Sequence, residues 1–270
     1  MNNVHAFVVY VVNQYINHQK LRPTHIREIQ MENKKKKWKT LRHYTSVGWL
    51  KQILMDDRLK FSNALDQNIE QRWDDQNDIA ILRLYYQLYH KNPLVCCFTH
   101  SISIHHWEYY GKTYPNRHSY EDELKCCIVF DYDKFLNMVE LKKQKGMNLI
   151  LNGVTYISLN NLKSNAITKK DMPFIKKYGF NVDKEERLVL FVDNEKCEEH
   201  FLTGVVNCIK SVTLYVKHEM SEKQIDKVKS ELIKIYPKLQ GNIHQSALCN
   251  SKRWQKQIIR SINNTKNSSL

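Results

Sequence analysis

The sequence has few of the residues that interrupt regular structure. Its 270 residues include only seven glycines and five prolines. This scarcity argues against collagen-like, linker-rich and turn-dense β-sandwich proteins. We see no internal repeat with a period of roughly 20–50 residues, which argues against a solenoid. The hydrophobic share of 42% and the aromatic share of 11% supply material for a real core. We therefore expect a folded globular chain.

Cysteine and histidine are present without a metal-binding pattern. The seven cysteines are an odd number, and four of them form the adjacent pairs Cys96-Cys97 and Cys126-Cys127. Neighbours in a strand point to opposite faces, so such pairs suit neither zinc chelation nor a disulfide framework. Four histidines lie close together in the sequence, His100, His105, His106 and His118. No carboxylate or cysteine lies at a chelating interval to complete a metal-ligand set. We expect free thiols in a reducing compartment and no metal site.

Long apolar runs are also missing. The apolar stretch 6–12 is far shorter than the roughly 20 residues that cross a bilayer. It lacks the basic start and the small-residue cleavage site of a signal peptide. The sequence therefore predicts a cytoplasmic protein without a membrane partner.

Acidic residues are in the minority. Forty-two lysines and arginines oppose 28 acidic residues, which leaves a net charge of +14. Lysines cluster at 34–37, and the stretch from Gly241 onward has basic residues but no acidic ones. A positive field attracts polyanions, so nucleic acid is a candidate partner. The alternative is a bacterial chain that simply accumulates lysine, asparagine and isoleucine.

Helical and extended patterns are interspersed along the chain. Helices are expected at 3–19, at 47–54, at 78–91 before Pro93, and from Ser221, whose apolar stripe has helical spacing. Strands are expected at 41–46, 60–62, 94–99, 126–130, 154–157, 186–191 and 211–216. The order shows neither regular strand–helix alternation nor glycine-rich turns. It therefore favours an α+β fold over a doubly wound parallel sheet.

The first chemical constellation is His43-Tyr44-Thr45. In a strand, His43 and Thr45 share one side and Tyr44 takes the other. A histidine beside a hydroxyl group, at the mouth of the following helix, suits binding of a ribose hydroxyl or a carbonyl. The alternative is a half-buried histidine that is satisfied by backbone groups.

A second constellation combines hydroxyl and aromatic groups. Thr99 ends a strand, and Trp107 and Tyr110 follow three residues apart, on one face of an expected helix. Together they indicate a pocket for a flat ring. Ordinary core aromatics are the alternative.

The third constellation lies at the head of the strand 186–191. At a period of two, Asp183, Glu185 and Arg187 share one face, and Glu186 points to the other. Two carboxylates and a guanidinium are costly in such a place unless they are paired or used. The alternative is a salt-bridged strand start at the surface. The sequence has no phosphate-binding glycine loop, nucleophile elbow or His-Glu-x-x-His motif.

These segments, in this order, resemble a bacterial family of unknown function, DUF2971, that includes abortive-infection proteins. The resemblance covers roughly residues 38–236 and rests on the segments 41–46, 59–62, 97–99, 107–111, 127–131, 183–188 and 209–214. Two positions depart from the family pattern. The family often has Asn-Asp-Pro-x-Glu after Phe-Ser, where this chain has 63–66, and it usually has glycine where this chain has Val216.

The same pattern is similar, more remotely, to the ADP-ribosyltransferase superfamily of toxins and anti-phage effectors. The matching positions are His43, Thr99 with the nearby aromatics, and Glu185. The resemblance implies an α+β fold with a split, mixed β-sheet core flanked by helices. It implies a domain at 38–240, preceded by a helical segment and basic linker at 1–37, and followed by a basic, partly disordered tail at 241–270.

The resemblance also implies roles in the use of NAD as a substrate. Glu185 and His43 are expected to be catalytic, with Glu185 stabilising an oxocarbenium-like transition state. The expected NAD-binding residues are Arg42, His43, Tyr44, Thr45, Thr99, Trp107, Tyr110 and Arg187. Within this set, the ring of Tyr110 or Trp107 is expected to stack on nicotinamide, and Arg42 to bind the pyrophosphate. Arg187 is expected either to pair with Asp183 or to bind a phosphate group.

The expected function is that of an NAD-dependent ADP-ribosyltransferase toxin in a toxin–antitoxin or anti-phage system. It modifies nucleic acid, with RNA favoured over DNA, and an antitoxin or chaperone is a possible partner. Two alternatives stay open at this point. One is a non-catalytic module that binds nucleic acid or an antitoxin, and the other is an NAD-hydrolysing effector.

Overall fold

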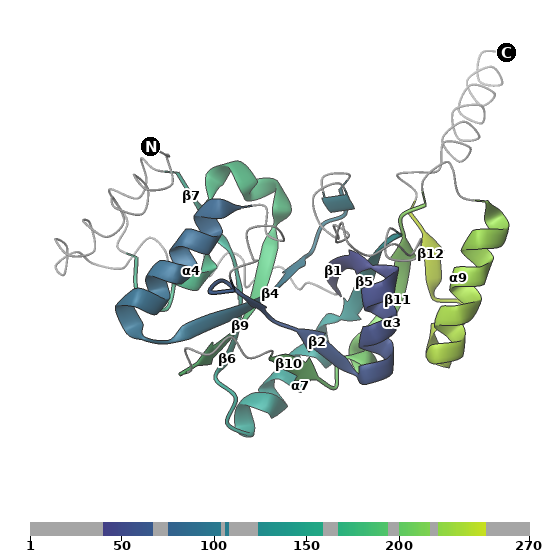
Figure 1. Cartoon of the computed structure of the whole chain (residues 1–270), viewed down its shortest axis with the longest axis horizontal. Coiled ribbons are helices and arrows are strands. Elements are labelled where there is room, and N and C mark those ends of the chain that lie inside the picture. Colours follow the sequence, from purple (N-terminus) through teal and green to yellow (C-terminus); the bar gives the residue numbers. More distant parts are fainter. Residues whose placement is uncertain are drawn as a thin grey trace, which may run out of the picture. The chain divides into compact units, whose positions relative to one another are not determined.

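The computed structural model of the chain describes residues 40–66, 75–103, 106–107, 124–158, 167–193, 200–216 and 221–246 (Figure 1). It forms two compact units. The first takes its described residues from Met1–His43, Asp57–Ser101 and Phe130–Cys208, and the second from Tyr44–Asp56, Ile102–Val129 and Ile209–Leu270. The helix expected at 3–19, the linker up to residue 37 and the tail from 247 onward lie outside the described residues. The domain boundaries stay a prediction.

The first unit is built around strand β4 (Asn92–Thr99). It pairs antiparallel with β9 (Glu185–Val192) over its whole length, from Asn92 opposite Val192 to Thr99 opposite Glu185. On the far side of β9 lies β6 (Leu149–Gly153), also antiparallel. The other edge of β4 meets β1 (Thr40–Ser46) and the short β3 (Ser62–Asn63). The continuous apolar run 94–99 therefore forms the central strand that the sequence predicts.

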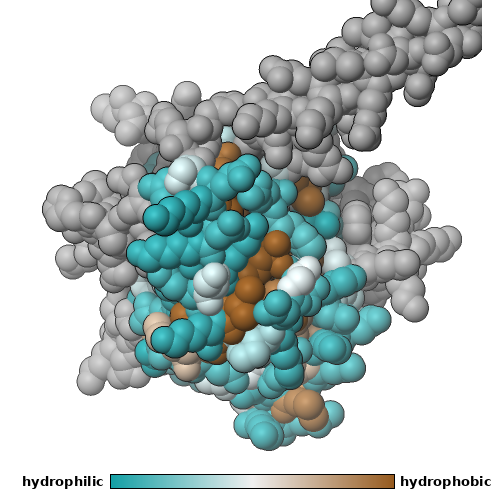
Figure 2. All heavy atoms as spheres, turned by 90° about the vertical axis from the view of Figure 1, so that its right-hand side faces the viewer, coloured by the Kyte–Doolittle hydropathy of each residue, from teal (hydrophilic) through white to brown (hydrophobic). Residues whose placement is uncertain are grey.

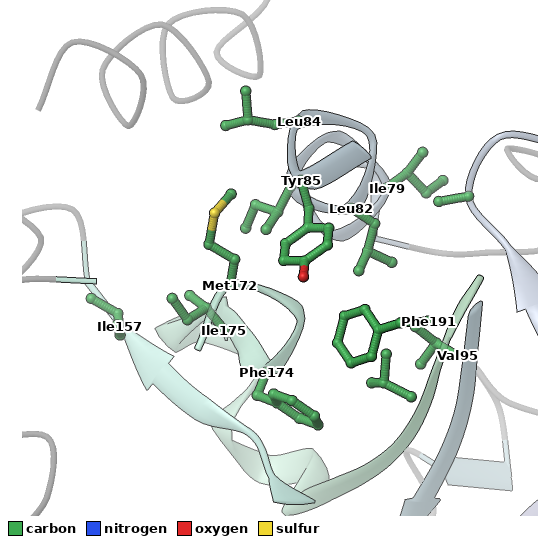
Figure 3. Packing of buried hydrophobic residues seen from close by; sticks show 13 residues of the cluster. Ile79, Leu82, Leu84, Tyr85, Val95, Ile157, Met172, Phe174, Ile175 and Phe191 are labelled. Atoms are coloured by element: carbon green, nitrogen blue, oxygen red, sulfur yellow. The ribbon is translucent and has the colours of Figure 1, made fainter. Parts of the chain in front are cut away.

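One face of β4 is covered by helix α4 (Gln76–Tyr89), as expected from its periodicity. Asp75 caps the start of the helix, and His90 closes its end in the left-handed conformation, before Pro93 is reached. Figure 3 shows α4 side chains packed with Val95 and Phe191 and with the 3-10 helix η2 (Met172–Phe174). This face carries the odd-numbered β4 residues, including Cys97 and Thr99.

The opposite face is covered by helix α7 (Tyr132–Gln144), which the sequence analysis does not predict. Its Phe135 is buried and packs edge-on against Phe98 of β4, with ring centroids 5.0 Å apart. Asp131 caps the helix through the backbone N–H of Lys134. Helices thus lie on both faces of the strands of this unit and bury the apolar side chains of each face.

Smaller elements complete the first unit. Strand β7 (Thr155–Ile157) pairs parallel with β8 (Ile175–Lys177), and β10 (Phe201–Thr203) pairs antiparallel with β2 (Arg58–Lys60). The expected strand 60–62 is therefore split into β2 and β3. The 3-10 helices η3 (Tyr178–Asp183) and η4 (Val206–Cys208) link these strands to their neighbours in the sequence.

The second unit contains β11 (Ile209–Leu214) and β12 (Ile243–Gln245), which pair parallel, and most of β5 (Lys125–Asp131) next to β11. Its helices are α3 (Val47–Asp56), α9 (Glu222–Ile235) and the 3-10 helix η5 (Pro237–Leu239). Ser221 forms the expected cap of α9, as a capping box with Gln224.

Parallel and antiparallel pairs occur together, so the sheet is mixed, and helices flank it. The predicted α+β class is confirmed. None of the described helices combines the length and the apolar character needed to cross a membrane.

Candidate functional site at the start of β9

Three of the expected site residues stand side by side on neighbouring strands of the first unit. Arg42 of β1 is the register partner of Thr99 on β4, and Thr99 is the partner of Glu185 on β9. Directly paired residues of antiparallel strands project to the same face. We call these three residues the strand-end row. Residues that are far apart in the sequence are thus brought together by β-pairing.

Glu185 is the most strongly held member of the row. It is 7% exposed. Its Oε1 accepts a hydrogen bond of 2.6 Å from Nε of Arg187, and its Oε2 accepts one of 3.0 Å from Nζ of Lys176. Its backbone N–H donates to the hydroxyl oxygen of Tyr156 at 2.8 Å. The carboxylate therefore has one fixed orientation.

Two further acids complete a buried charged cluster, which we define as Asp78, Lys176, Asp183, Glu185 and Arg187. Arg187 is fully buried; its Nη2 bonds Asp78, and its Nη1 donates to the carbonyl of Pro173 at 2.9 Å. Asp183 accepts from Lys176 at 2.9 Å. The cluster thus combines three carboxylates with two cations, so one carboxylate is in excess when all five groups are ionised.

The predicted sharing of one face by Asp183, Glu185 and Arg187 is seen in these contacts. Asp183 itself lies outside the strand, because η3 ends there and Lys184 has a φ of +44°, in the left-handed region. β9 therefore begins at Glu185. The backbone carbonyl of Asp183 also accepts a 2.5 Å hydrogen bond from the hydroxyl of Thr99. The left-handed residue thus lets the chain fold back while both acids reach Lys176.

The surroundings in the cluster shift the pKa values of two of its acids, Glu185 and Asp78, in opposite directions. Burial alone raises the pKa of Glu185, but the charges of Arg187 and Lys176 outweigh it and lower the pKa to about 2. Burial raises the pKa of Asp78 to about 6 against the opposing charge of Arg187, and the charge of Glu185 adds to the rise. Oδ1 of Asp78 has no hydrogen-bond partner among the described residues. Glu185 therefore stays ionised to a lower pH than Asp78.

We expect the protein to lose stability at acidic pH, and we expect this loss to depend on Glu185. Its folded-state pKa of about 2 lies below the ordinary 4.5, so its stabilisation is full above pH 4.5 and is lost as the pH falls toward 2. The loss amounts to roughly 3 kcal/mol of the free energy of unfolding. Urea unfolding across this range should show it in the wild type and in Asp78→Asn. A Glu185→Gln variant with the same acid-side loss would contradict the assignment.

The side chain of Glu186, the next residue, lies on the opposite face of β9. Its carboxylate contacts Nε2 of His100 and accepts a hydrogen bond of 3.3 Å from the hydroxyl of Tyr132. Nδ1 of His100 lies 2.9 Å from the carbonyl oxygen of Thr40, and Arg42 donates from Nη1 to the backbone carbonyl of His100 at 2.8 Å. The prediction that Glu186 points away from Glu185 is confirmed.

His43, the second expected catalytic residue, is next to the row but not part of it. Its Nδ1 lies 3.0 Å from the carbonyl oxygen of Cys97, and its ring is tilted against Phe98 with centroids 5.7 Å apart. Burial lowers its pKa, and the hydrogen bond with Cys97 partly offsets this. Its contacts do not include Glu185, so a direct pairing of the two is not seen. This placement matches the alternative of a histidine satisfied by backbone, and a catalytic role stays a prediction.

The remaining expected residues belong to the second unit or lie outside the described residues. Trp107 is 1% exposed, and its ring packs edge-on against Tyr44 at 4.7 Å and stacks on Tyr215 at 5.0 Å. This matches the alternative of ordinary core aromatics. Thr45 is half-buried in β1, and Tyr110 lies outside the described residues.

Sequence reasoning missed three members of the site: Lys176, Asp78 and Tyr156. Lys176 stands in a Lys-Lys pair that reads as exposed, yet it is almost fully buried and bonds both Asp183 and Glu185. Asp78 reads as a favourable acid in the first turn of a helix. In the sequence, only the position of Arg187 inside an apolar strand indicates that its guanidinium needs buried, negatively charged partners.

Comparisons with known proteins add little. No family model matches the chain, and no curated protein sequence matches it. One solved structure, Thermus sp. 2.9 DarT in complex with NAD+, has 11% sequence identity; the match covers 78% of this chain and 96% of that one, with a TM-score of 0.32. A TM-score this low carries no argument about this chain. Among the residues that the structure describes, no group of three or more His, Cys, Asp or Glu side chains is placed to hold a metal ion.

Proposed function

We propose that the chain is an NAD-dependent ADP-ribosyltransferase that transfers ADP-ribose to nucleic acid, with RNA favoured over DNA, as a toxin of a toxin–antitoxin or anti-phage system. The observation that supports this most directly is the strand-end row of Arg42, Thr99 and Glu185. The family resemblance assigns NAD-binding or catalytic roles to these three residues, and the row unites a cation, a hydroxyl and a carboxylate at the ends of adjacent strands.

The ionisation of Glu185 suits the reaction. Cleavage of the bond between C1′ of the ribose and the nicotinamide nitrogen leaves the electron pair on nicotinamide and positive charge on the ribose. A fixed carboxylate stabilises this charge. The acceptor's oxygen or nitrogen then bonds to C1′ and loses its proton. A pKa of about 2 keeps Glu185 ionised throughout the neutral range.

Arg42 is suited to a phosphate group. Its Nη1 is engaged by the carbonyl of His100, but its buried Nε has no hydrogen-bond partner among the described residues. A buried donor without a partner is costly, and a phosphate oxygen would satisfy it. This supports the role of Arg42 at the pyrophosphate of NAD.

The direct test is incubation of the protein with NAD labelled in its adenylate part, together with RNA, DNA or protein. We expect the label to appear on nucleic acid, and more on RNA than on DNA. Release of nicotinamide with free ADP-ribose and no labelled polymer would identify an NAD hydrolase instead. Absence of both transfer and NAD consumption would overturn the proposal.

A surface for the acceptor is provided by α9. Lys223, Lys227 and Lys234 are exposed and lie at helical spacing on one face. Within the described part of the chain, Lys227 alone of the three has an ion pair, a loose one of 3.8 Å with Glu231. Figure 2 shows the side of the molecule on which α9 lies in Figure 1, where hydrophilic residues surround a narrow apolar strip.

We expect the triple change of these lysines to glutamine to weaken RNA binding at low salt by roughly tenfold or more. The slope of the salt dependence should fall by about one for each phosphate group that the variant no longer neutralises. Fluorescence anisotropy at several salt concentrations measures both. Lys143→Gln on α7, whose lysine pairs with Glu140, is the matched control. An unchanged slope in the triple variant would exclude α9 as the acceptor surface.

One observation favours the non-catalytic alternative. Both oxygens of Glu185 are already bonded within the buried cluster, an arrangement that a purely structural carboxylate would also have. A binding module predicts that RNA affinity survives Glu185→Gln in folded protein while no NAD is consumed by the wild type. The labelled-NAD experiment therefore separates the two functions.

A further inference from the structure

The backbone of Glu185 is held on both sides by the segment 154–156. The backbone N–H of Val154 donates to the carbonyl oxygen of Glu185 at 2.9 Å, and the N–H of Glu185 donates to the hydroxyl oxygen of Tyr156 at 2.8 Å. Tyr156 is also the register partner of Lys176, whose Nζ bonds the carboxylate of Glu185 at 3.0 Å. The hydroxyl of Tyr156 is therefore fixed beside Glu185 by strand pairing.

The hydroxyl of Tyr156 keeps a hydrogen to donate. A phenol oxygen both accepts and donates, and its O–H lies near the plane of the ring because the oxygen conjugates with it. With the N–H of Glu185 bonded on one side of the oxygen, the hydrogen points to the other side. No residue in the described part of the chain accepts this hydrogen. Tyr156 is only half-buried, so the hydrogen is available to a ligand.

The phenol stays protonated at neutral pH. Burial raises the pKa of Tyr156 above its ordinary value, and the charge of Glu185 adds to the rise. The hydrogen bond from the backbone of Glu185 and the charge of Lys176 offset only part of this rise. Tyr156 is therefore a neutral donor and not a base.

We propose that Tyr156 is a further substrate-binding residue, whose hydroxyl donates a hydrogen bond to a ribose hydroxyl or to the carboxamide oxygen of the nicotinamide riboside half of NAD. This inference rests on the proposed function, in which Glu185 stabilises positive charge at C1′ of that ribose. The ribose hydroxyls and the carboxamide are the polar groups on either side of C1′. Through one oxygen atom, Tyr156 then connects the substrate to the backbone of Glu185.

Tyr156→Phe removes the hydroxyl and keeps the ring. We expect it to raise the Kd for NAD by roughly five- to tenfold, because one hydrogen bond to the substrate is lost. The bond is present in the ground state and in the transition state, so kcat at saturating NAD should stay within about threefold of the wild type. Equilibrium dialysis with labelled NAD measures Kd, and release of nicotinamide measures kcat. An unchanged Kd with a reduced kcat would refute the contact, since the hydroxyl would then act only through the backbone of Glu185.

Tyr132→Phe is the matched control. It removes the same group from a tyrosine that bonds Glu186, the next residue of β9, on the opposite face. We expect it to change the Kd for NAD by less than about twofold. Equal weakening of NAD binding in the two variants would mean that the start of β9 has loosened, and would rule out a specific role for Tyr156.

Analogues of NAD identify the oxygen that is bonded. The 2′-deoxy and 3′-deoxy analogues of the nicotinamide ribose each lack one hydroxyl, and the thionicotinamide analogue has sulfur in place of the carboxamide oxygen. For one of the three, the ratio of Kd between Tyr156→Phe and the wild type should fall to about one, because no bond is left to lose. The same ratio for NAD and for all three analogues would contradict the proposal.

Failure of the proposed function gives a different result. A wild type that neither binds nor consumes NAD would remove the function and this inference together. A wild type that transfers ADP-ribose, with the same Kd as Tyr156→Phe, would reject only the role of Tyr156. If Tyr156→Phe does not fold, 3-fluorotyrosine at this position keeps the hydroxyl and gives a single ¹⁹F resonance. This resonance should shift when NAD is added, and an unchanged resonance would reject the contact.

Discussion

Replacing Arg187 by methionine is expected to lower the free energy of unfolding by about 3–5 kcal/mol. The guanidinium bonds Asp78, Glu185 and the carbonyl of Pro173, all inside the core. Without it, Lys176 is the one cation left in the cluster against three carboxylates. Methionine has a length similar to that of arginine. The loss in free energy of unfolding therefore comes more from the uncompensated carboxylate charges than from a cavity.

Chemical denaturation at neutral pH measures this change. Lys143→Met, at an exposed pair of α7, is the matched control and should change the free energy of unfolding by less than about 1 kcal/mol. A loss for Arg187→Met as small as that of the control would show that the cluster does not stabilise the fold. Partial recovery is expected at mildly acidic pH, because protonation of Asp78 removes one of the unpaired charges. Burial already raises the pKa of Asp78 to about 6 in the wild type, and loss of the positive charge of Arg187 raises it further.

Glu185→Gln is expected to reduce the rate of ADP-ribose transfer by roughly a hundredfold or more in protein that is still folded. The amide keeps the shape of the side chain but lacks the negative charge that stabilises the developing cation in the proposed reaction. It also disturbs the ion pairs with Arg187 and Lys176, so a loss of activity by itself does not identify a catalytic role.

Asp78→Asn is the matched comparison for that experiment. It likewise replaces a buried carboxylate that bonds Arg187, but Asp78 is on α4 and outside the strand-end row. We expect it to keep transfer within about tenfold of the wild type. The folded fraction of each variant should be checked by circular dichroism at the assay temperature. Equal losses of transfer in the two folded variants would assign Glu185 a structural role and favour the binding module.

The sequence predicts the parts of the fold that depend on local pattern. The run 94–99 becomes the central strand, the apolar stripe after Ser221 becomes α9, and alternation correctly separates Glu185 from Glu186. Helix α7 escaped prediction, although Phe135 and Val139 are spaced by one turn and Asp131 is a good cap.

Other features depend on contacts that no local pattern contains. Lys176 is buried because Asp183 and Glu185, seven and nine residues later, fold back on it through the left-handed Lys184. Asp78 meets Arg187 only because α4 packs over β9, 109 residues further along the chain. No local pattern indicates that the imidazole of His100 contacts both the carbonyl oxygen of Thr40 and the carboxylate of Glu186, because these contacts depend on strand pairing.

The adjacent acids Glu185 and Glu186 at the start of β9 raise the question of how this strand pairs with β4 in the correct register. A slip of β9 by one residue along β4 would exchange the faces of Glu185 and Glu186, and each would still meet a cationic or proton-donating partner. Arg187 disfavours the exchange, because the slip would move its guanidinium away from Asp78 to the face on which Phe98 packs against Phe135. A single arginine thus distinguishes the native alignment from a misfolded one that the two glutamates alone would tolerate.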